Sequence, residues 1–392
     1  MKRHRIAVVI GTRPEAIKMA PVVQSLKKRT DRLETLVIAT AQHRQMLDQV
    51  LSLFGIVPDV DLDIMRPNQT LSELTARVLT LMEKTLQEIR PDLLLVQGDT
   101  TTVLAASLSA FYNRIPVGHV EAGLRSHDMY NPFPEEINRQ LTTSLTTIHF
   151  APTALAKQKL LLEGVASDKI IVTGNTVIDA LLHQLQTPFN FKKTPLADIP
   201  LDNHRILLVT SHRRESWGRD LRNICLALET LVDRFPDLIV VYPVHMNPKV
   251  RETVIQHLHG KKRIFLIDPL DYLTFLNLMR KAYIVLTDSG GVQEEAPTLK
   301  KPLLVLRKLT ERPEAMQAGL AKVVGSDHHS IVEETSRLLN EESAYRTMVN
   351  GHNPYGDGLA AERIAEAVAR WVMGEQPLLA PEREFSTTIW GS

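Results

Sequence analysis

The fold is decided by the stretch AYIVLTDSGGVQEEAP at residues 282–297. Its apolar, β-branched run YIVL is typical of a buried strand in a parallel sheet. The run stops at Thr287, and Gly290 and Gly291 then lead into residues that favour a helix. Glycines let a ligand approach the backbone closely, and the free N–H groups at the start of a helix attract an anion. The stretch therefore predicts a strand, a tight turn and a helix with an anion site, with a simple capped turn as the alternative.

Two further side chains of this stretch favour a ligand site. Ser289 adds a hydroxyl donor, and Glu295, about one turn into the helix, can accept hydrogen bonds from hydroxyl groups such as those of a ribose. The order of strand, polar loop and helix recurs along the chain, and most unusual polar clusters directly follow a predicted strand. Because ligands of parallel sheets bind outside the carboxyl ends of the strands, this placement predicts a common binding site.

The composition is that of an ordinary globular protein and excludes several classes. The chain has 392 residues, of which 44% are hydrophobic and 23% charged, so it is long enough for two domains. A formal net charge of +1 provides no broad footprint for nucleic acid or an acidic membrane. No apolar run has transmembrane length and no signal peptide begins the sequence, so we expect a cytoplasmic protein. The single Cys225 excludes an internal disulfide, and its apolar neighbours at helical spacing predict a core thiol.

The alternation of strands and helices predicts an α/β protein with two Rossmann-like domains, whose parallel sheets face each other across a cleft. A proline-containing stretch without apolar periodicity interrupts the alternation, which then restarts at Arg205. The last predicted helix, at residues 359–373, belongs to the second half of the sequence, and its packing against the first domain is an alternative. We predict an N-terminal domain (1–185), a linker (186–204), a C-terminal domain (205–375) and a loose tail (376–392).

Three carboxylates of the N-terminal half are candidates for proton transfer. Asp99 and Glu121 end neighbouring predicted strands, and Glu135 opens a helix after the following loop. Carboxylates gathered in a partly desolvated site raise one another's pKa, which suits proton transfer near neutral pH. The simpler alternatives are a helix N-cap for Asp99 and a favourable helix-terminal charge for Glu135.

Basic side chains follow predicted strands in both halves and indicate phosphate binding. Arg13 and Lys18 belong to the first strand-to-helix junction, where they offer a diphosphate a planar fork and a point charge. In SHRRES (211–216) we expect His212 to be the direct ligand, with Arg213 or Arg214 in support. His245 ends an equivalent strand but ranks lower, because a single loop histidine commonly has no ligand.

Motifs for cofactors and metals are missing from the sequence. It contains neither the G-x-G-x-x-G fingerprint of dinucleotide sites nor the G-x-x-x-x-G-K-[ST] loop of nucleotide triphosphate sites. Asp59, Asp61 and Asp63 alternate with apolar residues as in an edge strand, and His328 and His329 lack spaced partners. We therefore expect no cofactor and no protein metal site.

Ten segments between about residue 6 and about residue 370 resemble, in order, the non-hydrolysing UDP-N-acetylglucosamine 2-epimerase family. The resemblance implies the two-domain fold of nucleotide-sugar glycosyltransferases (GT-B), a homodimer, and interconversion of UDP-GlcNAc and UDP-ManNAc for surface polysaccharides. The segments are GTRPEAIKMAPVV (11–23), TAQHRQMLDQV (40–50), GDTTT (98–102), GHVEAGLRS (118–126), PEEINR (134–139), TGNTVIDAL (173–181), HRRES (212–216), YPVHMNP (242–248), LTDSGGVQEEAP (286–297) and TERPEA (310–315).

The resemblance also implies individual site residues. Glu135 matches the third catalytic acid beside Asp99 and Glu121, and Leu270 stands where a glutamine is common near the uracil. Three other positions differ from the usual family sequence. A histidine is common at Gln97 and a small residue at Ser211, and Asp/Asn-Thr is usual at Lys308-Leu309, before Thr-Glu-Arg-Pro. Substrate contacts are implied for Arg13, Lys18, Asp99, Glu121, His212, Phe275, Ser289, Gly290, Gly291, Glu295 and Arg312, and a second, regulatory UDP-GlcNAc pocket for Gln42, Gln45, Glu135, Arg213 and His245.

The chemistry implied is elimination of UDP followed by its readdition. The C2 proton of the sugar is not next to a carbonyl, so C1–O cleavage must accompany its removal, and UDP is a stable leaving anion. Because the C2 proton is removed from one face of the sugar ring and delivered to the other, two acid–base groups are required. Three alternatives stay open: a GT-B glycosyltransferase that uses a UDP-sugar, a hydrolysing epimerase that releases ManNAc, and a non-catalytic UDP-sugar sensor.

Overall fold

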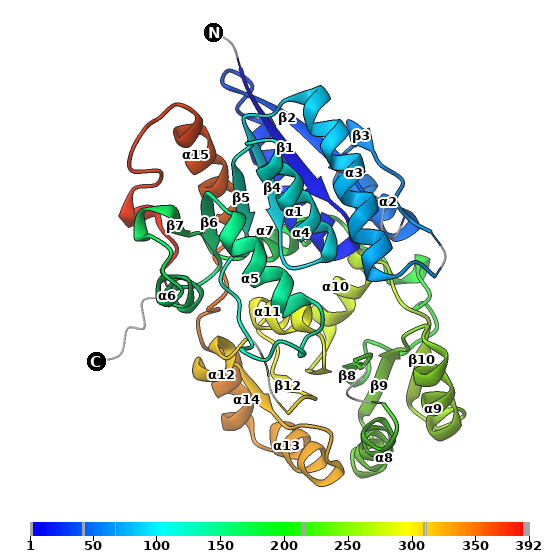
Figure 1. Cartoon of the computed structure of the whole chain (residues 1–392). Coiled ribbons are helices and arrows are strands. Elements are labelled where there is room, and N and C mark those ends of the chain that lie inside the picture. Colours follow the sequence, from blue (N-terminus) through cyan, green and yellow to red (C-terminus); the bar gives the residue numbers. More distant parts are fainter. Residues whose placement is uncertain are drawn as a thin grey trace. The chain divides into compact units, whose positions relative to one another are not determined.

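A computed structural model describes residues 3–40, 44–66, 68–213, 217–308, 310 and 312–386, with no account of the side chains of residues 44–46. The chain forms two compact units (Figure 1). Unit 1 comprises Met1–Leu182 together with Tyr355–Ser392, and unit 2 comprises His183–Pro354. No helix in the described part of the chain has both the length and the apolar character needed to cross a membrane.

Unit 1 contains a seven-stranded sheet in which every pair of neighbouring strands is parallel. The strand order is β3-β2-β1-β4-β5-β6-β7, so the order reverses between β1 and β4. Loops that leave such a point diverge and make room for a ligand. The strands are β1 (His4–Ile10), β2 (Leu33–Ala39), β3 (Val60–Asp61), β4 (Leu93–Gln97), β5 (Val117–Val120), β6 (Ile148–Ala151) and β7 (Ile170–Val172).

The helices of unit 1 begin where the sequence supplies caps. Thr12 and Thr70 each form a capping box with the glutamate three residues later, which satisfies N–H groups at the helix start. The predicted edge strand around Asp61 is confirmed, because β3 lies at the sheet edge. The helices are α1 (Arg13–Lys27), α2 (Arg44–Leu53), α3 (Leu71–Ile89), α4 (Thr101–Tyr112), α5 (Glu135–Leu145), α6 (Ala154–Leu162), α7 (Thr176–Gln184, which ends in unit 2) and α15 (Ala360–Val372).

Unit 2 repeats the same arrangement with six parallel strands in the order β10-β9-β8-β11-β12-β13. The prediction of two parallel-sheet α/β domains is therefore confirmed. The strands are β8 (Arg205–Thr210), β9 (Leu238–Pro243), β10 (Ile264–Ile267), β11 (Ile284–Thr287), β12 (Leu303–Val305) and β13 (Ala321–Val323). The helices are α8 (Arg219–Arg234), α9 (Pro248–Leu258), α10 (Tyr272–Lys281), α11 (Gly290–Thr298), α12 (Glu314–Gln317), α13 (His328–Asn340) and α14 (Glu342–Val349).

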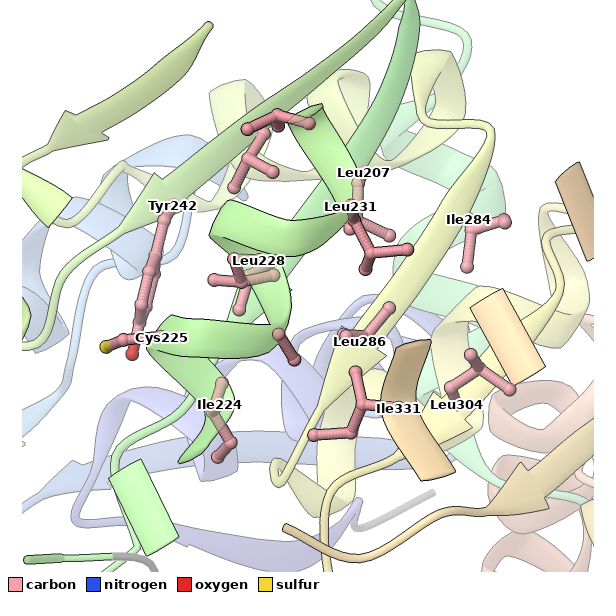
Figure 2. Packing of buried hydrophobic residues seen from close by; sticks show 14 of the residues in the cluster. Leu207, Ile224, Cys225, Leu228, Leu231, Tyr242, Ile284, Leu286, Leu304 and Ile331 are labelled. Atoms are coloured by element: carbon pink, nitrogen blue, oxygen red, sulfur yellow. The ribbon is translucent and has the colours of Figure 1, made fainter. Parts of the chain in front are cut away.

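The core of unit 2 shows why α8 forms where it does (Figure 2). Ile224, Cys225, Leu228 and Leu231 recur at helical spacing and are fully buried. Each such leucine contributes about 1.5–3 kcal/mol by leaving water. Burial raises the pKa of the Cys225 thiol to about 12, so the predicted core thiol is confirmed.

The stretch predicted as a linker, residues 186–204, belongs to unit 2 and packs on it. Leu196 and Leu201 are buried, and Lys281 pairs with Asp202 and lies over the ring of Phe191.

The C-terminal segment returns to unit 1 at Tyr355, earlier than the predicted domain end at residue 375. Asp179 caps α15, since its carboxylate accepts hydrogen bonds from the N–H groups of Ala360 and Ala361. The predicted tail is not loose as far as residue 386: Phe385 is buried and its N–H donates to the carbonyl of Val172. Residues 387–392 lie outside the described part of the chain.

Candidate active site

Glu121 lies at the carboxyl end of β5 in a network of buried polar side chains. Lys18 Nζ lies 2.5 Å from Glu121 Oε1, and the two side chains are only 9% and 6% exposed. Asn175 donates to the same oxygen at 3.0 Å, and Gln97 donates to Oε2. The backbone of Glu121 has φ +66°, a left-handed conformation that costs a non-glycine residue about 1–3 kcal/mol. Such strain is typical of functional sites.

Asp99, at the end of the neighbouring strand β4, is held by α5. Arg139 Nη2 donates to Asp99 Oδ2 at 2.6 Å, and Asn138 donates to the Asp99 carbonyl at 2.9 Å. Arg139 also contacts Glu136 at 3.0 Å, and Glu136 accepts the N–H of Ser126. Burial acts to raise the pKa of Glu136, but this hydrogen bond and the Arg139 charge outweigh it, so the pKa lies below its ordinary value. Arg139 and Glu136 were not among the predicted residues, although both belong to the segment PEEINR.

These contacts involve three of the predicted site residues. Lys18, predicted to bind a diphosphate, forms a buried ion pair with Glu121. Asp99 and Glu121, expected to raise each other's pKa, each form an ion pair with a cation, Arg139 or Lys18. Both carboxylates are therefore held in place by buried cations.

Glu15 is a buried acid that the sequence analysis did not identify. Its carboxylate accepts hydrogen bonds from the N–H groups of Gly11 (2.5 Å) and Thr12 (3.2 Å) and from Thr100 Oγ1 (2.7 Å). Glu15 thereby joins the loop after β1 to the loop after β4. Burial, with a smaller contribution from the charge of Asp99, raises the pKa of Glu15 to about 7. The half-buried Arg13 begins α1 beside this contact.

The remaining predicted residues of this unit can be located only in part. Glu135 is half-buried and is the first residue of α5. Gln42 and the side chain of Gln45 lie outside the described residues, as does Arg214 in unit 2. Of the predicted regulatory set, the structure therefore describes Glu135 in unit 1 and Arg213 and His245 in unit 2.

In unit 2 the centre of the site is Asp288, which the sequence analysis quoted but gave no role. Its side chain is fully buried at the end of β11, beside the loop that follows β8. Asp288 Oδ2 accepts hydrogen bonds from Ser211 Oγ (3.0 Å) and from the N–H groups of His212 (2.8 Å) and Arg213 (2.9 Å). Burial acts to raise the pKa of Asp288, but the His212 side chain and these N–H groups hold it below the ordinary value.

His212 lies between this aspartate and a second histidine. Its Nδ1 is 3.1 Å from Asp288 Oδ1. The ring of the exposed His245 stacks on it with 5.6 Å between ring centroids and an interplanar angle of 20°. Burial and the nearby charge of His212 lower the pKa of His245. The two predicted histidines are thus brought together by neighbouring strands.

The start of α11 has the features of the predicted anion site. Gly290 and Gly291 are its first two residues, and Ser289 is half-buried at the N-cap position. The Arg312 guanidinium lies so close that a β-carbon on Gly290 would be 2.7 Å from its Nη1. Arg312 Nε in turn donates to Glu294 at 2.6 Å, whereas a β-carbon on Gly291 would meet nothing within 4 Å. An anion at these N–H groups would therefore meet a positioned guanidinium.

Further predicted substrate contacts lie on α10, α11 and the loop before α10. Tyr272 donates from its hydroxyl to Glu295 Oε1 at 3.0 Å, which orients a carboxylate that is 6% exposed. Leu270 is buried before α10, and Phe275 is half-buried on that helix. Among the described residues no group of three or more His, Cys, Asp or Glu side chains could hold a metal ion.

Two buried histidines beside Glu121 make the stability of unit 1 sensitive to acid. His119 on β5 and His149 on β6 are paired in register and at most 1% exposed, and His119 Nε2 lies 2.7 Å from the Gly98 carbonyl. Burial lowers the pKa of His119 to about 4 and that of His149 to about 3. The unfolded chain, with ordinary histidine pKa values near 6.5, then binds more protons than the folded chain between about pH 4 and 6.5. Stability is therefore lost as the pH falls through this window.

We expect His119→Gln, which keeps a donor but does not titrate, to weaken this acid sensitivity. Between pH 7 and pH 4 the wild type should lose up to about 3 kcal/mol more unfolding free energy than the variant. Denaturant titrations at several pH values measure the difference, and comparison with the variant cancels the opposite effect of Glu15, whose raised pKa favours the folded state at low pH. The exposed His259→Gln is the control, and equal pH profiles for all three proteins would contradict the prediction.

Comparisons with known proteins identify the family of this chain. Residues 24–369 match the family model described as UDP-N-acetylglucosamine 2-epimerase. The chain is 54% identical over 369 residues to UDP-N-acetylglucosamine 2-epimerase from Escherichia coli K12, covering 93% of this chain and 98% of that protein.

Solved structures give the same result. UDP-GlcNAc 2-epimerase from Neisseria meningitidis, bound to UDP-GlcNAc, is 48% identical with a TM-score of 0.88, covering 93% of this chain and all of that one. S. aureus MnaA in a co-structure with UDP is 47% identical with a TM-score of 0.88, covering 95% and 97% of the two chains. By sequence and by fold, this chain belongs to the UDP-N-acetylglucosamine 2-epimerase family.

Proposed function

We propose that this protein interconverts UDP-GlcNAc and UDP-ManNAc by elimination and readdition of UDP. The observation that carries the proposal is the pair of carboxylates at adjacent strand ends, Asp99 and Glu121, each beside a buried cation. A carboxylate positioned in a partly desolvated site is a suitable base for a carbon-bound proton. The family assignment supports the same reaction.

The nucleotide is assigned to unit 2. The N–H groups of Gly290 and Gly291, the Ser289 hydroxyl, Arg312 and His212 would bind the diphosphate. Arg13, at the first strand-to-helix junction, is a further candidate for diphosphate binding. Glu295, oriented by Tyr272, would accept hydrogen bonds from the ribose, and Leu270 and Phe275 would contact the uracil.

The sugar is assigned to the carboxylates of unit 1. One carboxylate removes the C2 proton, the electron pair of that bond forms the C1=C2 double bond, and the C1–O pair leaves with UDP. The products of this step are 2-acetamidoglucal and UDP. For return, UDP oxygen attacks C1 and a second acid protonates C2 on the opposite face. Asp99, Glu121 and Glu135 supply these proton transfers, and the cations around the diphosphate stabilise the leaving charge.

UDP-GlcNAc incubated with the pure protein in D2O is expected to become a mixture with UDP-ManNAc in which C2 carries deuterium. The reason is that the C2 proton passes to a carboxylate that exchanges with solvent before the return step. A proton NMR time course measures both the new anomeric signals and the loss of the C2 proton signal.

Each alternative has its own result in the same experiment. Free ManNAc with UDP would identify a hydrolysing epimerase, and unchanged UDP-GlcNAc would leave a sensor or a transferase that needs an acceptor. Epimerisation without deuterium at C2 would contradict elimination.

Three wider properties are part of the same proposal. A homodimer is supported by large apolar side chains on unit 1 that are more than half exposed, such as Phe111 and Tyr112 at the end of α4 and Tyr130 in the loop before α5. A regulatory UDP-GlcNAc pocket would use Gln42, Gln45, Glu135, Arg213 and His245. A cytoplasmic role in supplying surface-polysaccharide precursors fits a single, buried cysteine.

A further inference from the structure

The contacts of Asp288 determine which ring nitrogen of His212 carries a proton. A carboxylate only accepts hydrogen bonds, and Asp288 Oδ1 lies 3.1 Å from His212 Nδ1. The backbone N–H groups of His212 and Arg213, together with the Ser211 hydroxyl, hold the other carboxylate oxygen, so the aspartate cannot turn away. A proton on Nδ1 is therefore the arrangement in which this contact is favourable.

This arrangement limits how His212 can bind an anion. In a neutral imidazole with its proton on Nδ1, Nε2 has a lone pair and can only accept. A phosphate oxygen also accepts, so the two would repel. Nε2 can donate to phosphate only when both ring nitrogens are protonated, and the buried Asp288 carboxylate then balances the positive charge.

We infer that Asp288 is a positioning residue that fixes the proton on Nδ1 of His212, so that UDP is bound by the imidazolium Nε2–H and its binding takes up a proton. The identity of the ligand, UDP, is the one part of this inference that rests on the proposed function. The tautomer of His212 is a property of the protein without ligand. Solvent supplies the proton, and no covalent bond changes.

The other titratable groups around the ring are compatible with this role. His245 stacks on the ring, and burial lowers its pKa, which favours a neutral neighbour for the imidazolium. Lys249, in the first turn of α9, lies over the ring of Trp217. Tyr242 donates to the Ser211 carbonyl and, being buried, has a raised pKa and stays neutral. Among the described groups, Asp288 is the carboxylate in contact with His212.

The tautomer is tested without ligand by histidine 15N NMR at a pH where the ring is neutral. The wild type is expected to show a protonated Nδ1. In Asp288→Asn the amide can donate to Nδ1, so the proton should move to Nε2. Protonation of Nε2 in the wild type, or the same tautomer in both proteins, would overturn the inference whether or not the protein binds UDP.

Proton uptake is tested by calorimetric titration of UDP at pH 7.5 in buffers of different ionisation enthalpy. The wild type is expected to take up about 0.5–1 proton more than His212→Gln, and Asp288→Asn should lose this excess and bind UDP about 10-fold or more weakly. His212→Gln also subtracts the titration of UDP itself, and it tests the inference even if Asp288→Asn does not fold.

The matched control is Asp237→Asn. Asp237 is paired with Arg205 at 2.6 Å. This pair lies at the amino ends of β8 and β9, whereas His212 follows the carboxyl end of β8. The variant should therefore take up protons like the wild type. UDP binding with equal proton uptake in the wild type and His212→Gln would overturn the inference and leave the proposed function intact. Failure of the wild type to bind UDP would count against the proposed function, with the NMR result still deciding the tautomer.

Discussion

Asp99→Asn and Glu121→Gln are each expected to lower kcat by at least about 100-fold, the low end for positioned acid–base groups. Both amides keep the shape of the side chain but cannot take up a proton. Asp99 and Glu121 end adjacent strands, and each is held in place by a buried cation and by hydrogen bonds from other elements. Steady-state kinetics with UDP-GlcNAc, on protein shown to be folded by circular dichroism, measure the effect.

A matched control separates lost chemistry from a lost ion pair. Glu163 contacts the fully buried Arg125 at 2.7 Å, with side-chain exposures of 34% and 0%, close to the 29% and 5% of the Asp99–Arg139 pair. Glu163→Gln should therefore disturb unit 1 about as much as Asp99→Asn, yet retain kcat within about threefold. Near-normal turnover in both Asp99→Asn and Glu121→Gln would refute the proposed mechanism.

Lys18→Met is expected to lower the free energy of unfolding by about 3–5 kcal/mol. The substitution removes the cation of a buried ion pair, while Glu121 keeps the hydrogen bond from Asn175. Burying an uncompensated charge is costly, while methionine fills much of the space of the lysine chain. Equilibrium denaturation with guanidinium measures the loss of unfolding free energy. Hydrogen exchange of the backbone amides in unit 1 shows whether the loss belongs to that unit.

The double variant Lys18→Met/Glu121→Gln tests the cause. Since it removes both charges, it should recover a large part of the stability lost in Lys18→Met. Lys157→Met is the control, because Lys157 pairs with Glu384 at 3.2 Å where both side chains are 24% exposed, and it should cost no more than about 1 kcal/mol. A double variant less stable than Lys18→Met would show that the Glu121 charge is not the source of the loss.

Much of the secondary structure could be predicted because consecutive residues encode it. The predicted strand YIVL becomes β11, the alternation restarts with β8 at Arg205, and the helix predicted at 359–373 is α15. Elements that were not predicted include β13 with three residues and α12 with four. Local periodicity contains little information about such elements.

The candidate site was predictable in its residue types but not in its partnerships. The chain displays Asp99, Glu121 and His212 at strand ends, which is a local feature. Their partners are Arg139, Lys18 and Asp288, at sequence separations of 40, 103 and 76 residues. No periodicity or motif spacing connects residues so far apart.

The sequence by itself determined two α/β halves with polar loops at the carboxyl ends of their strands, because side-chain periodicity and turn chemistry act between near neighbours. Only the tertiary structure decided which charge neutralises which, and that the chain returns to unit 1 at Tyr355. The physical reason is strand order. The pairing of β8 with β11 places Asp288 beside His212. The pairing of β1 with β4 and of β4 with β5 brings Glu15 in the first turn of α1, Asp99 and Glu121 to the carboxyl ends of neighbouring strands.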